Sequence, residues 1–266
     1  MTSTLAAQSA IPHLLGDDEH AAVGRILVVI PTYCEAANIE TVIARVRRAV
    51  PAADMLVVDD DSPDGTAARV RVAGARLGRI EVLSRTEKAG LGAAYRAGFA
   101  HGLAQGYDVL IEMDADLSHD PGALPQLIDA IAHGADLAIG SRYIPGAAIP
   151  GWKTSRRALS RWGNRYAAFV LGIETADLTS GYRAFTADSL RAADYASTEA
   201  TGYAFQIELA QRVAGAHGVI REVPIVFHDR ADGESKMSSR IAVEALVLVT
   251  WWGLRDRWQR RVGRGA

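Results

Sequence analysis

Two aspartates, Asp114 and Asp116, stand one residue apart shortly after the largely apolar run 107–111. Carboxylates with this spacing at the exit of a strand can share a divalent cation, and such a cation neutralises the diphosphate of a nucleotide-linked substrate. The pair therefore points to transfer chemistry on a phosphorylated donor. The alternative is an ordinary turn, because turns after strands are rich in Asp for reasons of backbone hydrogen bonding.

The elements that must position this pair alternate, from Arg25 onward, between short β-branched runs and longer helical patterns. Because the short runs are continuous and apolar, they indicate buried parallel strands. This order predicts an α/β fold with a doubly wound, mostly parallel sheet flanked by helices. The predicted strands are 26–30, 55–58, 80–83, 109–113 and 137–139, and the predicted helices are 38–50, 66–77, 91–105 and 124–132.

After Tyr143 the regular alternation of short strands and longer helices ends, and no obvious linker marks a domain boundary. We interpret this part as an elaboration of the same domain that covers the crevice at the strand ends. Its predicted elements are a helix at 152–171, an extended segment at 178–186, a helix at 203–214 and a strand at 219–227.

Polar, glycine-rich or charged clusters follow all five predicted strands. The carboxyl ends of parallel strands meet at one edge of a sheet, where α/β proteins bind their ligands. The clusters are therefore expected to converge, which favours a functional site over five unrelated turns. They are 31–35, 59–65, 85–92, 114–116 and 140–143.

Several residues of these clusters have individual expectations. Asp60 or Asp59 can accept hydrogen bonds from a base or a ribose hydroxyl. Lys88 precedes a predicted helix start, where unpaired amides suit phosphate. The segment Asp64-Gly65-Thr66 is expected to cap the following helix, with Asp64 or Thr66 satisfying its free amides. His119 is expected to cap a turn or face solvent rather than act as an acid or base.

The composition is that of an ordinary soluble globular chain, with 49% hydrophobic and 23% charged residues. The formal net charge of -2 gives no reason to expect nucleic acid as a partner. The single cysteine, Cys34, excludes an intramolecular disulfide and a Cys-based zinc site. Any anion binding must therefore come from local clusters of charge.

Six ordered motifs, between about Arg25 and about Ser239, resemble those of dolichol- or polyprenol-phosphate mannose synthases. These are family 2 glycosyltransferases with the nucleotide-sugar-binding fold called GT-A. The resemblance predicts a single GT-A domain at 25–239. The composition of the flanking residues predicts a flexible tail at 1–24 and a C-terminal amphipathic, basic helix at 240–266. The motifs are PTYCE (31–35), VVDDDSPDGT (57–66), MDADLSH (113–119), GSRY (140–143), TSGYR (179–183) and GESK (233–236).

The resemblance implies an inverting transfer of mannose from GDP-mannose to a polyprenyl phosphate, with Mg²⁺ or Mn²⁺ as cofactor. Asp116 and Arg142 are then the expected catalytic residues, and Asp114, Asp116 and Ser118 the expected metal ligands. The expected nucleotide-sugar-binding residues are Pro31, Tyr33, Glu35, Asp60, Lys88, Asp114, Ala115, Asp116, Arg142, Arg230 and Lys236. Arg142, Arg156 and Ser160 are expected to hold the acceptor phosphate.

Two positions depart from the family pattern. Cys34 stands where the family often has Asn. Ser118 stands where some members have a Gln that reaches the metal. Because Ser is a shorter and weaker ligand, water can replace this third contact, and the choice between Mg²⁺ and Mn²⁺ stays open.

The chemistry of a phosphate acceptor agrees with this resemblance. A phosphate monoester, with a second pKa of about 6, is already largely dianionic at neutral pH and needs no general base. Such a site needs cations instead. The planar fork of Arg142 can hold two phosphate oxygens and so position the nucleophile.

A row of basic residues lies in the predicted helix 152–171. Lys153, Arg157, Arg161 and Arg165 recur at spacings of four, which places them on one helix face. Like charges at this spacing repel each other, so the row indicates that this helix face binds an anionic partner. A solvated surface is the alternative.

The C-terminal stretch 241–254 is apolar apart from Glu244 and Thr250, and five arginines and one aspartate follow it. Its length falls short of the roughly 20 residues that cross a bilayer as a helix. The Arg residues and Trp251, Trp252 and Trp258 suit an anionic membrane surface. We expect peripheral attachment at the cytoplasmic face, directly or through a membrane-anchored partner protein; ordinary core packing is the alternative.

Two other functions remain open at this stage. The same fold can use another donor, such as UDP-glucose, because base and sugar specificity depend on a few contacts. A non-catalytic binding protein can also keep this fold, although the intact acid pair, Arg142 and Lys236 argue against it.

Overall fold

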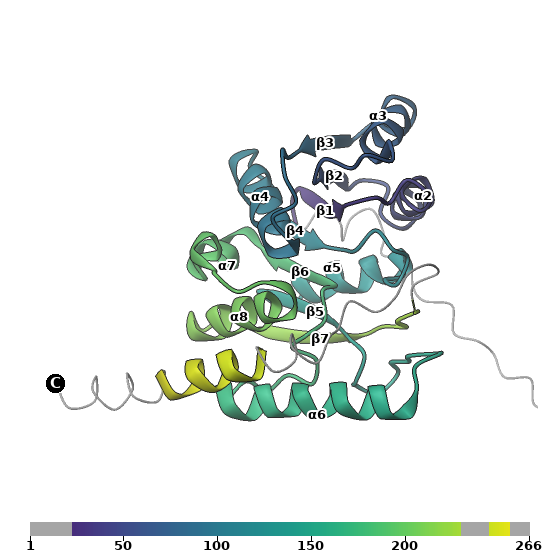
Figure 1. Cartoon of the computed structure of the whole chain (residues 1–266). Coiled ribbons are helices and arrows are strands. Elements are labelled where there is room, and N and C mark those ends of the chain that lie inside the picture. The colour runs from purple at the N-terminus through teal and green to yellow at the C-terminus, as the bar shows by residue number, and fades with distance from the viewer. Residues whose placement is uncertain (1–22, 230–244, 256–266) are drawn as a thin grey trace, which may run out of the picture.

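The computed structural model describes residues 23–229 and 245–255 (Figure 1). Their strands form one seven-stranded sheet in the order β3-β2-β1-β4-β6-β5-β7, with helices on both faces. The predicted α/β fold class, a single domain around a mostly parallel sheet, is confirmed. The strands are β1 (Ile26–Thr32), β2 (Asp54–Asp59), β3 (Ile80–Ser84), β4 (Val109–Glu112), β5 (Leu137–Ser141), β6 (Arg183–Thr186) and β7 (Ile220–Pro224).

Only β6 among these strands runs against its neighbours. It lies between β4 and β5 and is antiparallel to both, whereas the β1–β2, β1–β4, β2–β3 and β5–β7 pairs are parallel. The carboxyl ends of the other strands therefore meet at one edge, as predicted. The segment predicted as extended at 178–186 is a strand only from Arg183, and residues 178–182 run along that edge as a loop.

Strand β7 ends earlier than the predicted strand 219–227. Beyond Pro224 the chain leaves the ladder but keeps two single bridges, from Val226 to Ala148 and from Phe227 to His119. The second bridge brings the end of this segment next to the loop that follows β4.

The helices divide between the two faces of the sheet. One face carries α2 (Ile39–Ala49), α3 (Thr66–Leu77) and α5 (Leu124–Ala132). The other carries α4 (Leu91–Ala104), α6 (Thr154–Leu171), α7 (Ala187–Ala192) and α8 (Gly202–Gly215). The short helix α7 and two 3₁₀ turns at Pro121–Ala123 and Tyr195–Ser197 were not expected.

The strand residues alternate between these two helical layers. In β1, Ile26, Val28 and Ile30 pack against α2 and α5, whereas Leu27 and Val29 face the opposite side. All five are buried. Because both faces are covered, the strands are apolar at consecutive positions, which explains why their sequences are continuous apolar runs.

Helix α4 approaches the sheet closely because it has glycines on its inner face. A Cβ atom at Gly102 would lie 2.6 Å from Leu110 Cδ2, and one at Gly98 would overlap the side chain of Val29. The close packing lets Tyr95, on the same helix, reach the carboxyl edge and the first aspartate of the acid pair.

Residues 245–255 form a further helix beside α6 (Figure 1). Val249 and Trp252 are buried in the core, and the hydroxyls of Tyr166 and Thr250 lie 2.7 Å apart. Across the described residues, no helix combines the length and apolar character needed to cross a membrane. Residues 1–22, 230–244 and 256–266, with Arg230, Lys236 and Trp258, lie outside the described residues, so the domain boundaries stay a prediction.

Candidate active site

A cleft of about 410 Å³ opens at the carboxyl edge of the sheet. It collects residues from four of the five predicted clusters, together with the loop before β6 and the start of α8. Eight predicted nucleotide-sugar-binding residues line it: Pro31, Tyr33, Glu35, Asp60, Lys88, Asp114, Ala115 and Asp116. Thr179, Gly181, Gly202, Tyr203 and Gln206 also line it and carried no individual role in the sequence analysis.

Asp114 is held from two sides. Tyr95 donates its hydroxyl to Asp114 Oδ1 at 3.3 Å, and the backbone N–H of Asp114 donates to His119 Nδ1 at 3.2 Å. His119 is buried and stacks on Tyr182 with ring centroids 4.8 Å apart. Burial lowers the pKa of His119, and a neutral ring is also what an accepting Nδ1 requires.

His119 is therefore not solvent-facing, and that part of the prediction was wrong. The sequence alone could not show that Phe227 would return from the far end of the chain to cover the ring, edge to face at 5.7 Å. The role that the structure supports is to fix the backbone of the acid pair.

Asp116 is held by its own turn. The hydroxyl and the backbone N–H of Ser118 both donate to Asp116 Oδ1, at 2.6 and 3.0 Å. Leu117 between them has a φ of 61°, an unusual backbone for a bulky residue. Ser118 is buried and does not line the cleft, so this arrangement makes it a positioning residue for Asp116 and does not support the predicted role as third metal ligand.

The acid pair has the chemistry of a magnesium-type site. Two carboxylates on the cleft wall leave the remaining coordination positions to water and substrate phosphates, which is how Mg²⁺ is usually bound at phosphate sites. Within 23–229 and 245–255, no three Asp, Glu, His or Cys side chains come together as a protein-only metal cage. The residues present therefore fit a cation that binds together with a diphosphate.

The two aspartates at the end of β2, Asp59 and Asp60, have different roles. Asp59 accepts hydrogen bonds from Thr32 and from the amide and hydroxyl of Ser62, which ties two loops together. Asp60, in contrast, lies on the cleft wall and pairs with Arg85 at 3.0 Å. Burial raises the pKa of Asp60, and Arg85 acts in the opposite direction. Of the two alternatives, Asp60 is the one placed to meet a ligand.

The same end of the cleft carries an aromatic ring and a cation. Lys88 Nζ lies 3.7 Å from the centre of the Tyr33 ring. Asp64 accepts from the amides of Ala36 and Thr66, so it joins the loops after β1 and β2 and holds the first amide of α3, although the N-cap position itself is Gly65. At this end of the cleft, Tyr33, Lys88 and Asp60 therefore lie on loops that hydrogen bonds hold together.

Arg142 lies outside this cleft and is already paired. Its Nε and Nη2 donate to the two carboxylate oxygens of Asp177, each at 2.7 Å, and Nη2 also donates to Thr179 at 2.8 Å. Burial lowers the pKa of Arg142, but Asp177 more than offsets it, so the net shift is upward. Conversely, Arg142 overcomes the effect of burial and lowers the pKa of Asp177.

The fork of Arg142 thus grips a carboxylate, not the two phosphate oxygens that the sequence analysis assigned to it. Asp177 stands 35 positions along the chain from Arg142, and nothing in the local sequence marks the two as partners. The pair ties β5 to the loop before β6.

A second, mainly apolar groove of about 110 Å³ adjoins Arg142. It runs between α6, α8 and the helix 245–255, and Arg142, Arg156 and Ser160 line it together, as expected for one binding site. Arg156 lies 3.9 Å above the Trp152 ring and pairs with Asp229 at 3.2 Å. Ser160 accepts from the Tyr143 hydroxyl at 2.7 Å.

The groove and the cleft share two lining residues, Thr179 and Tyr203. A ligand in the cleft and a ligand in the groove would therefore meet at this wall. The remaining groove residues include Leu159, Trp162, Ala167, Ile207, Ala245, Leu246 and Val249, an apolar lining suited to a hydrocarbon chain.

Beneath the cleft lies a buried polar group that the sequence analysis did not single out. Arg183 donates to the backbone oxygens of Leu178, Ser180 and Gln206 at 2.6 to 2.7 Å. Burial raises the pKa of the neighbouring Glu112 to about 8, with Arg183 acting in the opposite direction. At neutral pH Glu112 is therefore largely protonated and adds little negative charge below the acid pair.

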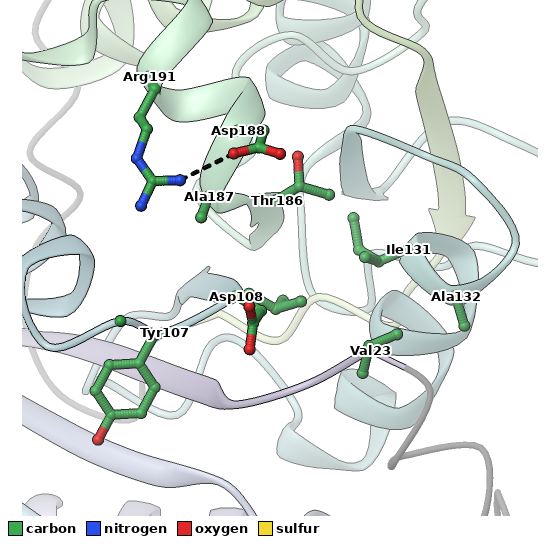
Figure 2. Close-up of a pocket in the computed structure, with 11 residues that line it drawn as sticks. Val23, Tyr107, Asp108, Ile131, Ala132, Thr186, Ala187, Asp188 and Arg191 are labelled. Atoms are coloured by element: carbon green, nitrogen blue, oxygen red, sulfur yellow. Dashed lines mark hydrogen bonds and ion pairs between the residues drawn. The ribbon is translucent and has the colours of Figure 1, made fainter.

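Another cavity, of about 340 Å³, lies at the opposite edge of the sheet (Figure 2). Its lining includes Asp108, Thr186 and the Asp188–Arg191 ion pair, whose atoms are 2.9 Å apart. It contains none of the predicted site residues. The functional groups singled out from sequence are thus concentrated at the carboxyl edge.

Comparison with known proteins defines the class to which this fold and site belong. The family described as Glycosyl transferase family 2 matches residues 27–193, and the chain belongs to this family. The protein is therefore a glycosyltransferase.

Within that class, two relatives agree with the resemblance seen in the six motifs. The undecaprenyl-phosphate mannosyltransferase of Micrococcus luteus is 50% identical over 235 residues, covering 88% of this chain and 96% of that protein. The polyprenol monophosphomannose synthase of Mycolicibacterium smegmatis is 48% identical over 240 residues, covering 90% and 91%. The family resemblance drawn from the sequence is confirmed.

The fold also matches a solved structure. Glucosyl-3-phosphoglycerate synthase from Mycobacterium tuberculosis, in complex with Mn²⁺, UDP-glucose and phosphoglyceric acid, has a TM-score of 0.66 and 21% sequence identity. The match covers 91% of this chain and 85% of that one. The match supports the GT-A fold.

Proposed function

We propose that this protein transfers mannose from GDP-mannose to a polyprenyl monophosphate, with inversion at the sugar carbon. The observation that carries the proposal is the meeting of two unlike cavities at Thr179 and Tyr203. One contains the acid pair and other charged side chains, and the other is almost wholly apolar with cations at one end. The relatives that share about half of the sequence bear names of the same reaction class.

The donor lies in the cleft that contains the acid pair. Tyr33, Glu35 and Asp60 hold the guanosine, and Asp114 and Asp116 bind Mg²⁺ or Mn²⁺ together with the diphosphate. When bound, the cation offsets the negative charge that builds on the departing GDP. Tyr95 and Ser118 keep the two carboxylates in place, so little reorganisation is needed.

The acceptor lies in the groove. Its prenyl chain packs between α6 and the helix 245–255, and its phosphate lies near Arg156, Ser160 and the outer side of Arg142. A phosphate dianion is already a nucleophile at neutral pH, so no side chain has to remove a proton. Attack from the groove on a sugar whose diphosphate lies in the cleft gives inversion.

Peripheral contact with the cytoplasmic face of a membrane agrees with the surface near the groove. Trp162, Phe169, Val247, Trp251 and Leu254 are exposed large apolar residues on α6 and the helix 245–255. Such residues clustered on neighbouring helices suit a lipid surface. The row Lys153, Arg157, Arg161 and Arg165 is exposed at the start and along the length of α6, where it can meet anionic headgroups.

The direct test is product formation from GDP-mannose and a polyprenyl phosphate, detected by mass spectrometry. We expect mannosyl-phosphoryl-polyprenol with Mg²⁺ or Mn²⁺, none after chelation, and none from Asp116→Ala. Product from UDP-glucose but not from GDP-mannose would overturn the donor assignment. Full activity in the presence of chelator would overturn the metal.

A further inference from the structure

The donor cleft contains a glycine that neither the backbone nor the packing requires. Gly181 does not have a positive φ. A Cβ atom built on it would lie 3.7 Å from Gln206 Nε2 and 3.8 Å from His119 Cε1, which is ordinary van der Waals distance. At Gly92, by contrast, an added Cβ atom would lie only 3.0 Å from Phe205 Cδ2, so the close packing there requires glycine. The absence of a side chain at Gly181 is therefore not needed to avoid a clash. Its effect is to leave space in the cleft.

Gln206 borders that space with an amide that is largely unused. The side chain is only 2% exposed, and its amide lies beside the Glu112 carboxyl, where burial raises the pKa of Glu112 and a hydrogen bond from Gln206 acts in the opposite direction. An amide has two N–H donors and an acceptor oxygen, so this one contact leaves most of its capacity without a partner. Buried polar groups without partners are costly, and a ligand that supplies partners is favoured.

The order of groups along the cleft indicates which part of a ligand reaches this position. The wall with Tyr33 and Asp60 lies at one end, and the acid pair follows β4 nearer the centre of the sheet. Gly181 and Gln206 lie on the side where Thr179 and Tyr203 border the acceptor groove. A nucleotide diphosphate sugar placed with its diphosphate at the acid pair puts its hexose over Gly181.

We propose that Gly181 and Gln206 form the seat of the transferred hexose, in which Gly181 provides room for the ring and the Gln206 amide hydrogen-bonds a ring hydroxyl. An amide supplies both a donor and an acceptor, as a sugar hydroxyl does. Gln206 is thereby a specificity-determining residue among hexoses. This inference rests on the proposed function, because it takes the donor to be a nucleotide sugar.

The local scaffold suits such a role. Arg183 binds the backbone oxygen of Gln206 at 2.6 Å and that of Ser180, beside Gly181, at 2.7 Å. One guanidinium thus fixes both sides of the seat relative to each other. A site built on rigid elements in this way can discriminate between hydroxyl configurations.

The test compares binding of GDP with binding of GDP-mannose, each with Mg²⁺, by titration calorimetry, and adds turnover. For Gly181→Val and Gln206→Leu we expect GDP affinity within about twofold of wild type. GDP-mannose affinity and kcat/KM should fall by roughly 10- to 100-fold. Gln206→Leu should also narrow the preference for GDP-mannose over GDP-glucose.

Two substitutions on α8 serve as controls. Gly215→Ala adds a methyl group at a position with nothing within 4 Å, and Gln211→Leu makes the same exchange outside both cavities. Both should leave binding and turnover unchanged. Gly181→Ala, the smaller change, covers the case in which the valine variant does not fold.

If wild type binds GDP-mannose and forms product, but the Gly181 and Gln206 variants behave as wild type, the hexose seat is wrong. Equal loss of GDP and GDP-mannose affinity in the variants also overturns it. Failure of wild type itself to use GDP-mannose overturns the proposed function.

Discussion

Arg142 and Asp177 form a two-point ion pair, with both contacts 2.7 Å long and both side chains buried. The pair connects the end of β5 to the loop that carries Thr179, one of the two residues that line both the cleft and the groove. Its first role is therefore to hold in place the loop between the cleft and the groove. Because Nε and Nη2 of Arg142 already bind Asp177, Nη1 is the part of the guanidinium left for an acceptor phosphate.

Breaking this pair should destabilise the protein strongly. Asp177→Asn leaves the buried Arg142 charge uncompensated, and we expect the free energy of unfolding to fall by about 3–5 kcal/mol in urea titration. Asp188→Asn, which removes one partner of an exposed ion pair, is the matched control and should change little. Equal effects of the two substitutions would contradict this assignment.

The pair should also make stability depend on pH in one direction. Because Arg142 lowers the pKa of Asp177 in the folded state, the stabilisation is present above the unfolded pKa of about 3.9 and is lost as the pH falls toward the folded value. The difference in Tm between wild type and Asp177→Asn should therefore shrink below about pH 4. A difference that stays constant down to pH 3 would argue against the ion pair.

Ser118 should act on the metal through Asp116. Ser118→Ala removes the 2.6 Å hydrogen bond that orients Asp116 Oδ1, so we expect a 10- to 100-fold loss in Mn²⁺ affinity or in turnover. Ser118→Thr retains the hydroxyl and should keep most of both. The readouts are a Mn²⁺ titration and the initial rate, and an alanine variant equal to wild type in both would rule out the positioning role.

Cys34 should be replaceable with a gain in stability. Its φ is 60°, a backbone that costs most residues about 1–2 kcal/mol but that Asn adopts more readily. Cys34→Asn should therefore raise the free energy of unfolding by up to about 1 kcal/mol, whereas Cys34→Ala should not. Thermal unfolding of the three proteins at one pH measures this, and an unchanged or lower Tm for the Asn variant contradicts it.

The exposed apolar residues near the groove should mediate membrane contact. Phe169→Ser combined with Trp251→Ser should reduce co-sedimentation with liposomes that contain anionic lipid, because both side chains are more than half exposed. Val72 on α3, on the other face of the sheet, is 72% exposed and offers a matched control as Val72→Ser. Equal sedimentation of all variants would exclude this surface.

The sequence predicted the parallel strands well because each is a short apolar run covered on both faces, as in Ile26–Thr32. It did not predict the direction of β6, since the four residues Arg183–Thr186 have no pattern that distinguishes antiparallel pairing. The acid pair and Asp60 were found because they directly follow strands. Asp177 and Gln206 were missed because their roles arise from partners distant in the chain.

The motif TSGYR indicated part of the cleft wall, since it contains both Thr179 and Gly181. It could not reveal that Gln206, on α8, completes the same wall. The role of Ser118 as a metal ligand was predicted from its position in the family motif. In the structure, the tight turn at Leu117 directs the Ser118 hydroxyl to Asp116 instead.

The reversed direction of β6 has a consequence for the order of events at the site. A strand that runs backwards presents the residues before it, not those after it, at the carboxyl edge, so one short stretch from Asp177 to Arg183 serves both cavities. Thr179 in this stretch lines both cavities. A substrate that displaces Thr179 would therefore reshape the other cavity, and we expect loading of one substrate to alter the rates at which the other enters and leaves.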